Sequence, residues 1–195
     1  MLNFIKCKFE TVKKHKKYII IFSLCYLLGF ILSIFLSHKN SSNAIFFNVF
    51  NYHVIIFNLN VSVISVFFKC FFAGVLLTVT VFAFGFSKYT VPLEGIIIFY
   101  RGITLGSALI YFYQISQISG VVVFFILTIP THVAVTAGLI FSSALNFEIQ
   151  NIKDLKKKTL AILKNCLISV FFTFIASLYL LILLVTVIRP INLIV

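Results

Sequence analysis

Long apolar runs, separated by short and more polar connections, recur five times along this chain. They occupy residues 18–36, 61–87, 91–113, 118–147 and 167–188. A helix needs about 20 mostly apolar residues to cross the hydrocarbon core of a bilayer. The pattern therefore predicts an all-α, polytopic membrane helix bundle with five transmembrane helices, which forms a single integral membrane domain over residues 1–195.

The composition supports this assignment. Hydrophobic residues make up 62% of the chain and charged residues 10%, whereas about 25% of the residues in a soluble domain are charged. The first apolar run is too long for the hydrophobic part of a secretory signal, and no small-residue cleavage pattern follows it. We therefore expect the first run to be a retained membrane helix.

The positive charges are concentrated in alternate connections. The chain has a formal net charge of +12, and its lysines gather in the basic tail 1–17, between the second and third runs, and between the fourth and fifth. Under the positive-inside rule these connections are cytoplasmic, so the N-terminus is expected in the cytoplasm and the C-terminus outside. The basic clusters then favour anionic lipids at the inner surface as partners and give no reason to expect nucleic acid.

The connection 37–60 is the longest piece expected outside the membrane. Helical spacing places Asn48, Asn51 and Asn58 on one face, whereas several other residues are apolar, which predicts an amphipathic segment. Such a segment either rests on the lipid surface or contacts a partner protein. The residues proposed for a partner contact are Phe46, Phe47, Asn48, Phe50 and Asn51.

The same outward connections lack the groups that hydrolytic catalysis requires. Hydrolysis needs paired carboxylates, a metal-bound water or an activated nucleophile with a base. The four acidic residues, Glu10, Glu94, Glu148 and Asp154, all fall on or near the expected cytoplasmic side. The four cysteines show no C-x-x-C spacing. We therefore expect a protein that is not an enzyme, with no metal, no cofactor and no small-molecule substrate.

Small residues recur at four-residue spacing in every run, which lets helix backbones approach closely in a membrane. The first run has Gly29 with Ser33, and the third has Gly102 with Gly106. The predicted helix-packing glycines are Gly29, Gly74, Gly102, Gly106 and Gly138.

Ionisable and helix-breaking residues also occur inside the runs. Glu94 and Arg101 lie seven residues apart, on one helical face, so we expect Arg101 to extend toward Glu94 and the inner headgroups and to set the depth of this helix; a transported-ion site is the alternative. Pro130 is expected to kink the fourth run, with Thr128 or Thr131 satisfying a freed carbonyl. His132 is expected in an interhelical hydrogen bond, with a proton relay as the alternative.

The stretch "PLEGIIIFYRGITLG" (92–106) resembles the central span of the stage II sporulation protein M family in its clostridial form. That family has a similar proline, followed at the same distance by a basic residue (commonly lysine), a glycine and a second glycine. Upstream, "FNLNVSVISVFFKCFFAG" is similar to the family's asparagine and glycine-ended span. Downstream, "ILTIPTHVAVTAGLIFSSALNF" is similar to its penultimate span.

The resemblance implies a non-enzymatic membrane scaffold of the sporulation septum or mother-cell engulfing membrane. Members of the family are thought to recruit membrane-anchored peptidoglycan hydrolases, which thin the septal wall and permit engulfment during endospore formation. A transmembrane subunit of a transporter or channel is the main alternative. An intramembrane enzyme is a weaker one, because it would need a nucleophile and a base in facing helices.

Overall fold

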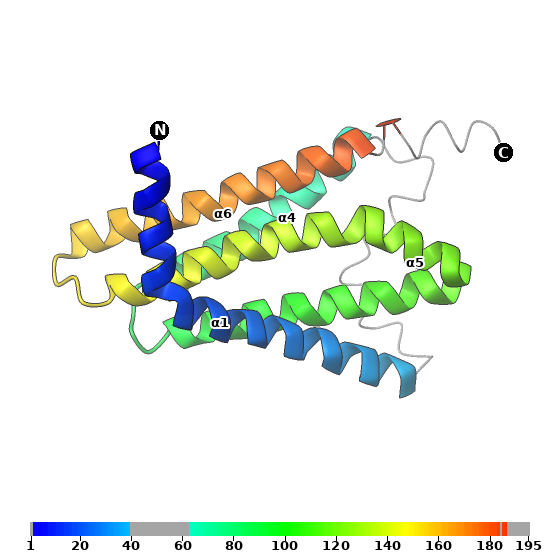
Figure 1. Cartoon of the computed structure of the whole chain (residues 1–195), viewed down its shortest axis with the longest axis horizontal. Coiled ribbons are helices and arrows are strands. Elements are labelled where there is room, and N and C mark those ends of the chain that lie inside the picture. Colours follow the sequence, from blue (N-terminus) through cyan, green and yellow to red (C-terminus); the bar gives the residue numbers. More distant parts are fainter. Residues whose placement is uncertain (1, 40–62, 184, 187–195) are drawn as a thin grey trace.

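Helices make up most of the described part of the chain. The computed structural model describes residues 2–39, 63–183 and 185–186, with no β-strand among them. The elements are α1 (Leu2–Lys39), α4 (Val63–Phe84), the 3₁₀ helix η1 (Val91–Leu93), α5 (Glu94–Ile149) and α6 (Leu155–Leu183), shown in Figure 1.

Five helical stretches within these residues are long and apolar enough to cross a membrane. They are Lys16–Leu36, Ile64–Phe84, Val91–Gln114, Gln117–Phe147 and Leu155–Leu183. The predicted all-α bundle of five membrane-length helices is thereby confirmed, and the chain is a multi-pass membrane protein. The fifth stretch begins at Leu155, ahead of the start expected at residue 167. The side on which each terminus lies stays a prediction.

The chain reverses direction within α5. Gln117 has φ 48° and ψ −123°, the one non-helical conformation inside this element. Figure 1 shows the two parts of α5 running back alongside each other from this point. We call residues 94–116 the first arm and residues 118–149 the second arm. The third and fourth membrane-length stretches are therefore the two arms of one helical hairpin.

The two other described turns lie at the opposite end of the bundle from Gln117 (Figure 1). In the turn between α4 and α5, the Thr90 hydroxyl donates to the carbonyl oxygen of Phe84 at 2.6 Å. In the turn between α5 and α6, a carboxylate oxygen of Asp154 accepts from the backbone N–H of Lys156 at 3.0 Å. This capping satisfies a donor that has no partner within the helix. We call this the basic end, because its turns and the start of α6 carry Lys88, Lys153, Lys156, Lys157 and Lys158.

The four α-helices of the described residues all contribute to one apolar core. Phe22 of α1, Val81 of α4, Ile98 and Leu139 of the two α5 arms, and Ala176 of α6 belong to a single buried cluster. Apolar side chains also cover the outside, where lipid replaces water, so the hydrophobic effect contributes little to helix association. The exposed set includes Leu28, Phe72, Ile96, Phe125 and Phe171. Close packing and interhelical hydrogen bonds must therefore hold the helices together.

The backbones of α1 and the first arm of α5 touch. A β-carbon added to Gly102 would collide with the carbonyl oxygen of Tyr26 on α1. One added to Gly29 of α1 would collide in the same way with the carbonyl oxygen of Phe99. Only glycine leaves room for this approach, so the two glycines fix where the helices cross.

The same crossing continues one turn further from the basic end. A β-carbon on Gly106 would lie 2.7 Å from the carbonyl oxygen of Phe30. Next to it, the hydroxyls of Ser33 and Ser107 form a hydrogen bond of 2.8 Å between the helices. In lipid, where water does not compete, such a bond adds to the attraction.

Small residues also bring α6 close to α4 and to the second arm of α5. A β-carbon on Gly74 of α4 would collide with the side chain of Thr173, and one on Gly138 would lie 2.9 Å from the Cα of Ser169. The hydroxyls of Thr78 and Ser169 share a hydrogen bond of 2.9 Å. The structure thus places all five predicted packing glycines at contacts between helices: Gly29, Gly74, Gly102, Gly106 and Gly138.

Candidate functional site

Glu94 and Arg101 both lie in the interior of the bundle. Their side chains are 0% and 6% exposed, and no ion pair joins them among the described residues. The expected extension of Arg101 toward Glu94 and the headgroups is therefore wrong. The reason is the orientation of the first arm: the face that bears these residues also bears Ile98 and Leu105, which are buried in core clusters.

A chain of hydrogen bonds begins at Glu94 and extends to two other helical segments. Asn146, on the second arm of α5, donates from Nδ2 to Glu94 Oε1 at 3.1 Å. Asn165 of α6 donates from its own Nδ2 to Asn146 Oδ1 at 3.3 Å. The Ser142 hydroxyl donates to the carbonyl oxygen of Asn165 at 2.7 Å. These bonds join both arms of α5 to α6 around one buried carboxyl group.

The same network continues to the surface of the basic end. Gln150 donates from Nε2 to the carbonyl oxygens of Asn146, at 2.9 Å, and of Gly85, at 2.8 Å. Its Oε1 accepts from Lys158 Nζ at 2.9 Å. We call this set the Glu94 network: Glu94, Asn146, Gln150, Lys158 and Asn165. It links a fully buried carboxyl group to a half-buried lysine at the basic end.

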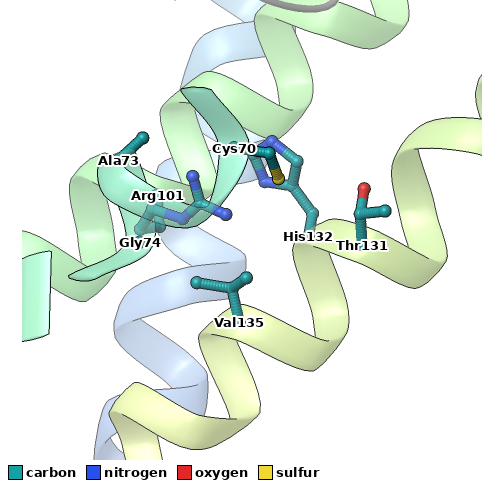
Figure 2. A pocket seen from close by; sticks show the side chains of 7 residues that line it. All are labelled: Cys70, Ala73, Gly74, Arg101, Thr131, His132 and Val135. Carbon is teal, nitrogen blue, oxygen red and sulfur yellow. The ribbon is translucent and has the colours of Figure 1, made fainter. Parts of the chain in front are cut away.

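Arg101 lines a separate, small cavity between α4 and the two arms of α5. The lining side chains, shown in Figure 2, are those of Cys70, Ala73, Gly74, Arg101, Thr131, His132 and Val135. Its volume is about 10 Å³, which is room for a single water-sized particle. The Nε–H of Arg101 is buried and has no hydrogen-bond partner among the described residues. We call this space the Arg101 cavity.

His132 lies on the second arm, with its ring near Arg101 and Cys70 (Figure 2). The side chain is 1% exposed. Its assignment to an interhelical hydrogen bond or to a proton relay stays open as a prediction. The structure nonetheless brings two candidates, Arg101 and His132, to one cavity, although no sequence pattern indicates that they are neighbours.

Pro130 leaves the carbonyl of Ile126 without its usual helical donor, because proline has no N–H. Tyr179 of α6 supplies the replacement: its hydroxyl donates to Ile126 O at 2.8 Å. Thr131, which was expected to serve a freed carbonyl, instead donates to Leu127 O at 3.1 Å. Gln117 is the only residue of α5 with non-helical dihedral angles, so the helix continues through Pro130, and a bend there stays a prediction.

Sequence reasoning missed Asn146, Gln150, Asn165 and Tyr179. For two of them a local signal exists, because Ser142, Asn146 and Gln150 recur every four residues along the second arm. This spacing places polar side chains on one helical face. The roles of Asn165 and Tyr179 depend on how α6 packs against α5, which one chain segment alone does not reveal.

Two further predictions concern a partner contact and the absence of a metal site. The proposed partner contact, Phe46, Phe47, Asn48, Phe50 and Asn51, lies outside the described residues. Within the described part of the chain, no three His, Cys, Asp or Glu side chains gather in a way that could hold a metal ion.

No protein-family model, no curated protein and no solved structure matches this chain.

Proposed function

We propose that this chain is a non-enzymatic membrane scaffold that recruits and anchors peptidoglycan hydrolases during endospore formation. Its place would be the sporulation septum or the mother-cell engulfing membrane, where the hydrolases thin the wall for engulfment. The proposal rests on the likeness of residues 92–106 to the stage II sporulation protein M family and on the part these residues play in the bundle.

The observation that carries the proposal is the contact between α1 and the first arm of α5. The two glycines of the resemblance, Gly102 and Gly106, pack directly against the α1 backbone. These glycines hold two helices of the bundle together, which is a role expected of a scaffold. They pack against the α1 backbone and not against a transport pathway. In this proposal the closely packed helices form the body of the scaffold, and the segment 37–60 carries the contact with the partner.

The glycine-bearing helix faces are therefore poor candidates for the partner contact. A bulky residue at Gly106 would disturb the contact with Phe30 and Ser33 inside the bundle, so lost recruitment would report misfolding. The segment 37–60 remains the place to test, with its aromatic residues as the contact.

Co-purification from sporulating cells tests the proposal. The tagged chain is expected to enrich membrane-anchored peptidoglycan hydrolases, and Phe47→Asp together with Phe50→Asp is expected to abolish that enrichment at unchanged abundance. Ser41→Asp with Ser42→Asp is the matched control, because it adds two charges to the same segment and keeps the aromatic residues. Enrichment that survives the phenylalanine changes would rule out this contact, and absence of hydrolases from the wild-type sample would rule out the scaffold.

A transporter or channel subunit is the second candidate, and the Arg101 cavity is the observation that favours it. An arginine and a histidine at membrane depth are typical of ion and proton pathways. A cavity with room for one water-sized particle is too small for a larger substrate in this conformation. Recovery of a nucleotide-binding subunit in the same co-purification, in place of hydrolases, would favour transport.

A further inference from the structure

The charge of Arg101 requires compensation within the bundle. A guanidinium group stays protonated in proteins, and this one is 6% exposed. Burying a charge without a partner is costly, and the cost is larger where lipid surrounds the protein. Buried charges are accordingly paired or bound to ions.

The side chains around Arg101 contain no carboxylate that could provide this compensation. The other residues lining the Arg101 cavity are Cys70, Ala73, Gly74, Thr131, His132 and Val135. The nearest acidic residue along α5 is Glu94, about 10.5 Å away along the helix axis. Its carboxyl group accepts a hydrogen bond from Asn146 instead. The positive charge therefore faces a cavity without a negative group from the described residues.

We propose that the Arg101 cavity binds one small monovalent anion, chloride under cellular conditions. The buried Nε–H of Arg101 provides a donor with no other partner among the described residues, and its charge provides the attraction. The volume of about 10 Å³ restricts the ligand to a monatomic ion and excludes phosphate, sulfate and carboxylate substrates.

The bound anion would act as a structural ion. The cavity is lined from α4, through Cys70, Ala73 and Gly74, and from both arms of α5. A negative ion at this point removes the penalty for the buried arginine and contacts all three helical segments. This role does not depend on hydrolase recruitment, so the two proposals can fail separately.

Thermal unfolding of the purified full chain in detergent tests the site. The melting temperature is compared in about 200 mM sodium chloride and in the same concentration of sodium gluconate, which keeps ionic strength constant. A ligand that binds only the folded state raises the melting temperature, and we expect a rise of about 5 °C in chloride. Arg101→Gln is expected to abolish the rise, whereas Lys156→Gln, which removes one exposed positive charge, is expected to retain it.

A second variant covers the case in which Arg101→Gln does not fold. Ala73→Val keeps the arginine and fills part of the Arg101 cavity, so it is also expected to abolish the chloride response. Line broadening in chloride NMR provides a direct measure of binding, expected for the wild type and for Lys156→Gln and absent for Ala73→Val. Equal melting temperatures in the two salts, or a chloride response that survives Ala73→Val, would overturn the proposal. The cavity would then be assigned to a water molecule.

Discussion

The hydroxyl of Tyr179 compensates for a proline on a neighbouring helix. It donates to the Ile126 carbonyl, which Pro130 leaves without a backbone partner. Within a bilayer water cannot take over this bond, so an unsatisfied carbonyl there is costly. Two residues that look unrelated in the sequence, 49 positions apart, thus act as a pair.

Removing this hydroxyl is expected to destabilise the protein, but only while the proline is present. Tyr179→Phe should lower the free energy of unfolding by about 1 kcal/mol. In a Pro130→Ala background the same change should cost much less, because the backbone N–H restored at position 130 then serves the Ile126 carbonyl. Thermal unfolding of the four proteins measures the coupling. Tyr89→Phe, at a side chain 90% exposed, is the control, and additive effects would contradict the pairing.

Two glycines of the first arm provide a second test at the scale of single residues. Gly102→Ala should lower the free energy of unfolding by about 2 kcal/mol, because its β-carbon would collide with the α1 backbone at Tyr26 and crowd Phe30. Gly95→Ala places a β-carbon 3.6 Å from the Phe22 ring, which is an ordinary contact, and should change stability little. The free energies of unfolding of both variants, measured in the same detergent, test this difference. Equal losses would show that the α1 contact is not the cause.

At the scale of elements, the reversal within α5 depends on one unusual backbone conformation. Gln117 has a positive φ of 48°, which costs a residue with a β-carbon about 1 kcal/mol or more. Glycine adopts positive φ without this cost. The turn of the helical hairpin is therefore strained at Gln117, and a glycine at this position would relieve the strain.

Gln117→Gly is expected to raise the free energy of unfolding by about 1 kcal/mol, and Gln117→Val to lower it. Gln114→Gly is the matched control, because this exposed position is helical and glycine there should be destabilising by about 1 kcal/mol. Chemical or thermal unfolding of the three variants measures the differences. A loss of stability with Gln117→Gly would contradict the strained turn.

The helices themselves follow from local signals, whereas their packing faces do not. The length of each apolar run is sufficient to predict five membrane-length helices, and four-residue spacing predicts which glycines pack. Side chains that face lipid and side chains that face the core are both apolar, however, so the sequence does not reveal the inward face of a helix. For this reason the sequence alone predicts Arg101 near the headgroups. The cavity that it shares with His132 depends on contacts between segments about 30 residues apart.

For the whole molecule, the orientation in the membrane is the property most open to test. The lysine distribution predicts that the basic end faces the cytoplasm and that the turn at Gln117 faces outward. Single cysteines are introduced at Gln117 and at Lys157, in a chain whose four native cysteines are replaced by alanine. A membrane-impermeant maleimide is expected to label the first in intact cells, and the second only after permeabilisation. Labelling of the cysteine at position 157 in intact cells would show that the predicted orientation is wrong and that the basic end faces outward.

The packing of α1 against α5 has a consequence for how the protein is made. The ribosome completes α1 long before the first arm of α5, so the nascent helix enters the bilayer without the segment that its glycine face fits. Until residue 107 has been synthesised, the Ser33 hydroxyl lacks the partner it has in the finished fold. The contact between α1 and the first arm can therefore form only after the first arm has been synthesised, so the last step of assembly joins two segments that are about 70 residues apart in the sequence.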